Sequence, residues 1–215
     1  MRKSIALAIA ALTLPLSALA ADSTNWTKWS TITDGTLVQN GNSVDVTFGG
    51  GAYFLDHSSY FYDVPSSFTS PDVTNAPATE GTIGMLGGDA TVHSFTFSQA
   101  VVDPVMAVFS VGQGSVPVRF VFDTDHFSVT SPTANGHWGG GTLVQAGNVV
   151  TGVEGNGLIQ FKGTFTKISF TTPDYENYYG GTIGAPAAAV PEPEALVLAL
   201  GGLMVVGGLA RRRRI

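Results

Sequence analysis

The chain has no cysteine among its 215 residues, so it can form no disulfide and has no thiolate to act as nucleophile or metal ligand. Basic residues are also scarce between positions 21 and 190, where only Lys28, Arg119, Lys162 and Lys167 occur. The same window holds 14 of the 16 acidic residues, which gives it a formal charge of −10. A body of that charge repels phosphate and lacks a basic patch, so we expect no nucleic-acid binding.

Long stretches with the helical period are absent as well, and apolar and polar side chains alternate instead. In residues 43–48 every even position is apolar and every odd position is polar. Residues 92–98 and 116–122 alternate in the same way, with His93 on the apolar side of the first and Val116 opening the apolar stripe of the second. Successive side chains of a strand point to opposite faces, so this pattern predicts strands half-buried against a second layer.

Residues 105–109 are apolar on both faces, which predicts a central strand covered on both sides and begun after Pro104. Further strands are expected at residues 26–33, 51–55, 142–145, 158–161 and 165–171. Many short strands with Gly-rich turns and no alternating helices predict an all-β fold. We expect a single β-sandwich or jelly roll over residues 21–184.

Two pairs of segments resemble each other. Residues 35–42 and 141–148 share Gly-Thr-Leu-Val-Gln, and residues 81–84 and 181–184 share Gly-Thr-Ile-Gly. The pairs are offset by 106 and 100 positions, and unequal offsets favour independent hairpin chemistry over an internal duplication. Residues 63–88 are poor in strand signals and are expected to form a long surface loop.

The N-terminus has the pattern of a secretory signal peptide. Arg2 and Lys3 precede an apolar run at residues 5–16, and Ala18 and Ala20 offer small side chains for cleavage before residue 21. The alternative is an N-terminal anchor helix, but the run is shorter than the roughly 20 residues that cross a bilayer. We therefore assign residues 1–20 to a cleaved signal peptide for Sec export.

The C-terminus has three parts in a fixed order. A linker at residues 185–194 contains Val190, Pro191, Glu192 and Pro193, an apolar run follows at residues 195–210, and residues 211–215 form a basic tail. As a helix, the apolar run reaches about 24 Å at 1.5 Å per residue, slightly short of the ~30 Å hydrocarbon core. Bilayer thinning and arginine snorkelling can compensate, so one transmembrane helix is expected.

The basic tail predicts the orientation of that helix. It contains four consecutive arginines, Arg211, Arg212, Arg213 and Arg214, which resist translocation and act as the membrane-retention signal. The C-terminus should therefore remain in the cytoplasm and the domain should lie outside.

The order Pro-Glu-Pro, short apolar helix and terminal arginine cluster resembles the PEP-CTERM sorting tail, over about the last 26 residues. The resemblance implies that Val190, Pro191, Glu192 and Pro193 form a sorting signal, which an exosortase in the inner membrane recognises and processes. It also implies delivery to the cell surface or extracellular matrix and a link to exopolysaccharide or biofilm. A plain stop-transfer anchor is the alternative reading. Residues 94–109 and 155–161 resemble ectodomains found on such tails, and that likeness carries no biochemical activity.

The body has no recognisable catalytic motif. Gly-x-Ser-x-Gly, His-Glu-x-x-His, P-loop and dinucleotide-binding patterns are absent, and acidic residues are scattered rather than clustered. The four histidines are dispersed, and His93 is expected to be a core residue rather than a ligand. We expect a protein without catalytic residues and without a bound cofactor.

One weak metal candidate remains. Asp123 and Asp125 point to the same side of an extended chain, and two carboxylates can hold calcium. Asp-x-Asp is also common at strand ends, where aspartate favours turns.

Aromatic residues gather at 53–54, 60–62 and 175–179, besides Trp138 beside a Gly-Gly-Gly stretch. Exposed together they could stack on sugar rings, with Trp138, Tyr60 and Tyr62 as the candidate glycan contacts, and core packing explains them equally simply. Two function classes follow: a structural or interaction protein of the cell envelope, and a carbohydrate-binding module, calcium-assisted or not.

Overall fold

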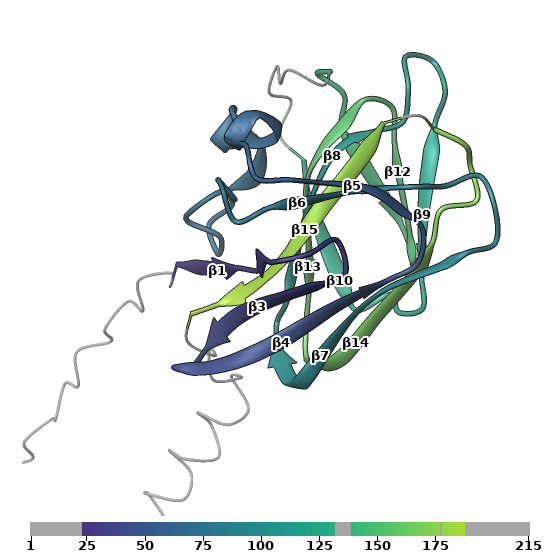
Figure 1. Ribbon diagram of the computed structural model, residues 1–215. Coiled ribbons are helices and arrows are strands. Elements are labelled where there is room, and N and C mark those ends of the chain that lie inside the picture. The colour runs from purple at the N-terminus through teal and green to yellow at the C-terminus, as the bar shows by residue number, and fades with distance from the viewer. Residues whose placement is uncertain (1–22, 132–138, 177, 188–215) are drawn as a thin grey trace, which may run out of the picture.

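The computed structural model describes residues 23–131, 139–176 and 178–187, which form two antiparallel β-sheets packed face to face (Figure 1). The strands are β1 (Thr24–Trp26), β2 (Lys28–Trp29), β3 (Asp34–Gln39), β4 (Asn42–Gly49), β5 (Ala52–Asp56), β6 (Thr82–Met85), β7 (Val92–Val102), β8 (Val105–Val111), β9 (Val118–Phe122), β10 (Phe127–Thr130), β11 (Leu143–Ala146), β12 (Val149–Gly152), β13 (Gly155–Phe161), β14 (Thr164–Thr171) and β15 (Tyr179–Pro186). Two 3₁₀ helices, η1 (Ser59–Tyr62) and η2 (Pro65–Phe68), follow β5. The predicted all-β, sandwich-like fold is confirmed.

Sheet A has the strand order β10-β13-β8-β15-β6-β5, and β1 pairs with the far end of β15. Sheet B has the order β11-β12-β9-β14-β7-β4-β3-β2. The strand that comes last in the sequence therefore lies inside sheet A, where β8 covers one edge and β6 and β1 share the other.

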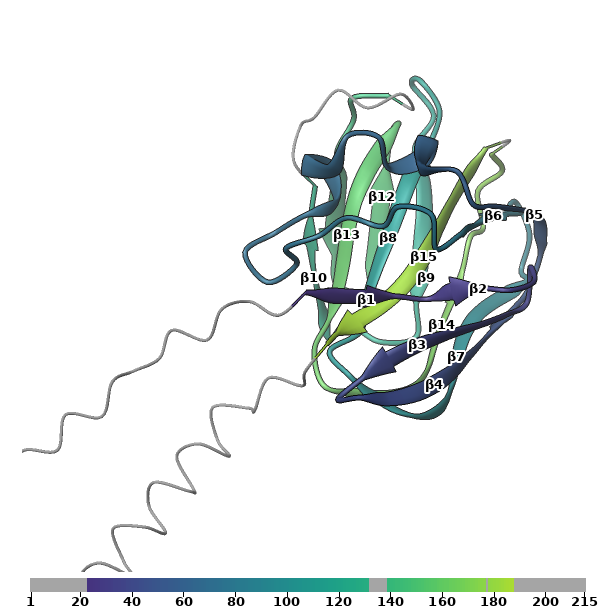
Figure 2. The same cartoon turned by 60° about the vertical axis from the view of Figure 1, so that its left-hand side comes forward.

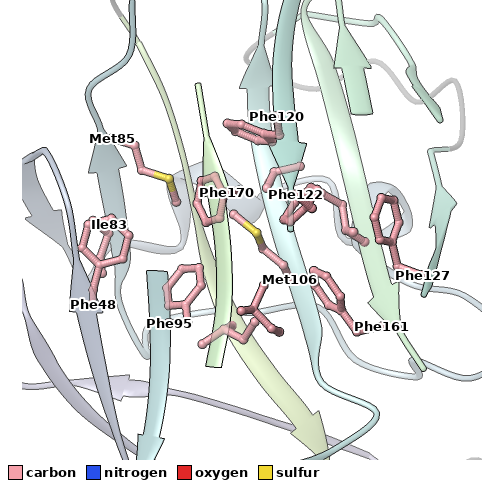
Figure 3. Packing of buried hydrophobic residues seen from close by; sticks show 14 of the residues in the cluster. Phe48, Ile83, Met85, Phe95, Met106, Phe120, Phe122, Phe127, Phe161 and Phe170 are labelled. Carbon is pink, nitrogen blue, oxygen red and sulfur yellow. The ribbon is translucent and has the colours of Figure 1, made fainter. Parts of the chain in front are cut away.

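The main core fills the space between the sheets and is rich in phenylalanine (Figure 3). Phe122 of sheet B lies 5.4 Å from Phe161 of sheet A and 5.3 Å from its neighbour Phe170, measured between ring centroids. Met106 of β8 enters the same layer and is fully buried. Burying each such side chain contributes about 1.5–3 kcal/mol, so this layer is the principal source of stability in a chain without disulfides.

A second core lies on the outer face of sheet A. Val105, Ala107 and Phe109 of β8 point to it, while Met106 and Val108 point to the main core. The segment that carries η1 and η2 passes over this outer face and covers it with Phe61, Tyr62 and Phe68 (Figure 2). Because both faces of β8 are covered, every residue of the strand is buried, as the sequence predicted.

Most predicted strands are found, with corrections at three places. The segment at residues 26–33 breaks at Thr27 and ends as β2 at Trp29. The stripe at 116–122 begins only at Val118, since Val116 is 45% exposed in the preceding turn. Residues 63–88 are not one long loop, because they contain η2 and β6, and β6 is buried at every position.

The repeated segments have two different structures. Residues 35–42 and 141–148 belong to hairpins, β3–β4 and β11–β12, as the hairpin interpretation predicted. In the first, Asn40 and Gly41 both have positive φ, of 54° and 76°, which a two-residue primed turn requires. The two Gly-Thr-Ile-Gly segments are instead neighbouring strands, and Gly181 of β15 pairs with Ile83 of β6.

The two ends of the described domain meet. Thr24 pairs with Pro186, and the Ala187 amide donates to the Ser23 carbonyl at 2.9 Å. β15 thus runs two residues past the expected domain end at residue 184. The signal peptide, the sorting signal Val190–Pro193, the apolar run and the terminal arginines lie outside the described residues, and within those residues no helix is long and apolar enough to span a membrane.

Candidate functional site

The calcium candidates lie in the exposed loop between β9 and β10. Asp123 accepts a weak hydrogen bond of 3.4 Å from the Ser169 amide, and the Asp125 carboxylate lies 3.6 Å from Nε2 of His126. Both aspartates are exposed, and in the described part of the chain they form no group of three or more ligands, with His126 or any other side chain, that could hold a metal ion. The described part of this loop therefore presents two separate carboxylates at a strand end and not an assembled calcium site.

His93 is fully buried in the main core, between the rings of Phe48 and Phe170. Its Nε2 lies 3.1 Å from the Thr172 hydroxyl, while Nδ1 has no hydrogen-bond partner. Burial lowers the pKa of the imidazole, which keeps it neutral. The predicted role as a core residue fits this position.

The three candidate glycan contacts are separated by the fold. Tyr62 is 3% exposed and its hydroxyl is bonded to the Thr82 hydroxyl at 2.8 Å, so its ring faces the second core and cannot meet a sugar. Tyr60 is 44% exposed at the start of η1. Trp138 lies outside the described residues. The structure thus removes Tyr62 from the predicted set and retains Tyr60.

Five aromatic rings form a connected surface cluster, which we call the aromatic platform. They come from β5, from η1 and from the loop before β15, and they are Tyr53, Phe54, Tyr60, Phe61 and Tyr178. Phe54 lies at the centre, 4.8 Å from Tyr53, 5.6 Å from Phe61 and 5.8 Å from Tyr178, between ring centroids. Tyr60 extends the cluster with an edge contact of 5.9 Å to Phe61.

Two features of sheet A hold the platform in place. Phe61 is buried against Phe109 of β8, with ring centroids 4.5 Å apart, which fixes η1 to the sheet. The Phe54 ring lies over Gly84 of β6, where a β-carbon would overlap it. The glycine is therefore needed for the ring to lie flat on the neighbouring strand.

The platform leaves two tyrosine rings partly exposed at the surface. Tyr53 and Tyr60 are 40% and 44% exposed, whereas Phe54 and Tyr178 are half-buried. Burial, together with the nearby Tyr178 and Glu176, raises the pKa of Tyr53 to about 12. Partly exposed tyrosine rings with their hydroxyls are suited to packing against a flat polar ligand and hydrogen bonding at its edge.

The loop that carries Tyr178 is anchored to the sandwich at two points. Asp174 accepts hydrogen bonds from Nε and Nη2 of Arg119, at 2.8 and 2.9 Å. Glu176 is 4% exposed and accepts a 2.7 Å hydrogen bond from the Gly112 amide. Burial raises the pKa of Glu176 to about 7, since the Gly112 hydrogen bond only partly compensates and the charge of Glu154 adds to the rise.

A shallow hollow of about 380 Å³ lies elsewhere on the surface, lined by Lys28, Trp29, His57, Thr79 and Glu80. Glu80 uses one carboxylate oxygen to accept from the Ala78 amide, and Trp29 is buried and bonded to Thr182. The hollow could hold a small polar molecule, but it offers no exposed aromatic face.

The sequence indicated parts of the platform without joining them. Tyr53, Phe54 and Tyr178 each belong to a run of aromatic residues, which is the available signal, but of the five platform residues only Tyr60 is among the three predicted glycan contacts. The comparisons add no further guide, since no protein-family model, no curated protein and no solved structure matches the chain.

Proposed function

We propose that this is a non-catalytic, exported bacterial protein of the cell surface or extracellular matrix, which binds glycan through the aromatic platform. In this proposal the signal peptide directs export, and the C-terminal helix anchors the protein in the inner membrane with its domain outside. An exosortase then processes the tail. The glycan partner is exopolysaccharide of the matrix.

The export and sorting steps are supported by the sequence of the two ends. At the N-terminus, basic residues are followed by an apolar run and then by small residues. At the C-terminus, Pro-Glu-Pro precedes an apolar run and four arginines. The body lacks the hydrolase, metalloprotease and nucleotide-binding motifs that would favour an enzyme.

The aromatic platform is the single observation that carries the binding function. Tyr53 and Tyr178 are 125 positions apart in the sequence, yet their ring centroids lie 6.5 Å apart. Tyr178 connects to the exposed Tyr60 through the ring of Phe61, and Tyr53 connects to it through Phe54 and Phe61. Rings in a core would be covered, whereas two of these remain at the surface at 40–44% exposure. Exposed aromatic clusters of this kind mark binding sites.

A glycan array, run with and without calcium, tests the binding. We expect neutral or amine-bearing oligosaccharides to bind without calcium, and Tyr60→Ala to weaken binding about tenfold, as truncating an aromatic anchor does. Tyr60→Phe should retain most of the affinity because the ring is kept. Val144→Ala, an exposed change on β11 of sheet B, is the matched control. Absence of any glycan binding would refute the proposed function.

The sorting step has its own test. Replacing Pro191, Glu192 and Pro193 with alanine removes the rigid extended segment that a membrane protease can bind. The variant should stay full-length and membrane-bound, as followed by immunoblotting of membrane and culture fractions. Shedding at the wild-type rate would contradict the sorting assignment and leave the glycan-binding assignment standing.

A further inference from the structure

The aromatic platform is built from two chain segments whose charged groups are three carboxylates and His57. Its rings come from residues 52–62 and 173–178, and these two segments contain Asp56, Asp174 and Glu176 but no lysine or arginine. Of the four basic residues in the domain, Arg119 is committed to Asp174, and the others belong to β2, β14 and the turn after β13.

Two of these carboxylates are close to platform rings along the chain, since Asp56 follows Phe54 by two positions on β5 and Glu176 precedes Tyr178 by two positions. Burial and then the charge of Asp56 raise the pKa of Tyr178, and Glu176 contributes to the raised pKa of Tyr53. Asp56 itself is firmly ionised, because hydrogen bonds from Ser58, including one of 2.6 Å from its amide, lower the pKa of the carboxyl group. A fixed negative charge therefore stands at the end of β5, two residues after Phe54, the central ring of the platform.

Ring faces and carboxylates favour the same kind of ligand. The face of an aromatic ring attracts a cation, and a neighbouring carboxylate adds a Coulombic attraction that salt weakens. A uronic acid polymer would be repelled by both features. A neutral sugar would gain only stacking, whereas a sugar that carries an ammonium group would gain stacking and both electrostatic attractions.

We infer that the aromatic platform takes a polymer of unacetylated hexosamine, whose ammonium groups face Asp56 while its rings stack on Tyr53, Tyr60 and Tyr178. This inference rests on the proposed glycan-binding function and names its substrate class. It also explains how an acidic domain can hold a polysaccharide, since a positively charged polymer is drawn to the whole body of charge −10.

Three matched oligosaccharides test the inference by titration calorimetry on the full chain in detergent. They are the hexamers of glucosamine, N-acetylglucosamine and galacturonic acid, which carry positive, neutral and negative charge respectively. At about pH 6 and low salt we expect the glucosamine hexamer to bind about tenfold more tightly than the acetylated hexamer, and the uronate hexamer not to bind. The difference should shrink at high salt.

Substitutions locate the effect. Asp56→Asn should reduce the ratio of the two affinities about threefold or more, since it removes the nearest charge. Asp45→Asn, an exposed aspartate of β4 in sheet B, should leave the ratio unchanged. Tyr60→Ala should weaken both hexamers.

The outcomes separate this inference from the function on which it rests. Equal affinities for the glucosamine and acetylated hexamers, or tightest binding of the uronate, would overturn the inference and leave glycan binding intact. A ratio that survives Asp56→Asn would overturn it too. If none of the hexamers and no other glycan bound, the proposed function itself would fail.

Discussion

Glu176 gives the domain a stability that depends on pH, and Glu176→Gln should remove that dependence. The Glu176 carboxylate lies in the loop before β15 and is buried against the sandwich. It accepts a hydrogen bond from the Gly112 amide. After burial, the charge of Glu154 adds to the raised pKa of Glu176, and Glu176 in turn adds to the burial-raised pKa of Tyr53 and Tyr179. A glutamine can accept the same hydrogen bond without carrying charge.

The magnitude follows from the pKa. Burial raises the pKa of Glu176 from 4.5 to about 7, and each unit corresponds to about 1.4 kcal/mol, so the ionised form costs the folded state up to about 3 kcal/mol. Because the folded-state pKa is raised, the protonated Glu176 stabilises the folded state relative to the ionised form, and this stabilisation is fully present below pH 4.5. It is lost as pH rises through about 7.

Urea unfolding between pH 4.5 and pH 8.5, followed by the fluorescence of the buried Trp26 and Trp29, measures the effect. At pH 8 we expect Glu176→Gln to be more stable than the wild type by about 1–3 kcal/mol, and the two to converge at low pH. Glu80→Gln makes the same chemical change at a half-buried position before β6, where a glutamine can accept the same hydrogen bond from the Ala78 amide, and should follow the wild-type curve. Parallel pH profiles for Glu176→Gln and the wild type would refute this account of the buried carboxylate.

Three substitutions test the packing around the site. Gly84→Val should displace the Phe54 ring, lowering both the urea midpoint and glycan affinity, because the new side chain takes the place of the ring. Asn156→Ala should cost about 1–3 kcal/mol in the same unfolding assay, since it leaves the buried Ser110 amide without its 2.9 Å acceptor. Phe61→Ala should cost about 3–5 kcal/mol and abolish binding, and unchanged binding would show that η1 does not support the platform.

The alternating strands could be predicted from the sequence because one face of each is solvated. Residues 43–48 and 92–98 became parts of β4 and β7 with the expected buried faces. The strand β8 could also be predicted, because it is apolar at every position of residues 105–109 and the two cores cover its two faces. These patterns depend only on local period and composition, which the sequence contains in full.

β6 and β15 were missed because their glycines resemble turn signals. In β15 a β-carbon at Gly180 or Gly181 would overlap the carbonyl of Ile83 or Ala107, so these glycines permit close backbone approach inside a sheet. The aromatic platform was missed for a related reason. The platform forms because β5, η1 and the residues just before β15 lie side by side. Their proximity depends on the strand order of sheet A, which local sequence patterns do not encode.

The place of β15 also governs when the domain can fold. Sheet A consists of two groups of strands, β10-β13-β8 and β6-β5, and these meet only through the strand formed by residues 179–186. While the chain is synthesised from its N-terminus and β15 is still absent, β6 and β8 each have an unpaired edge and β1 has no partner strand. Pairings of such large sequence separation form slowly, and unpaired edges attract other chains. Completion of sheet A therefore coincides with the arrival of the last residues of the domain, because the two groups of strands cannot join before β15 is present.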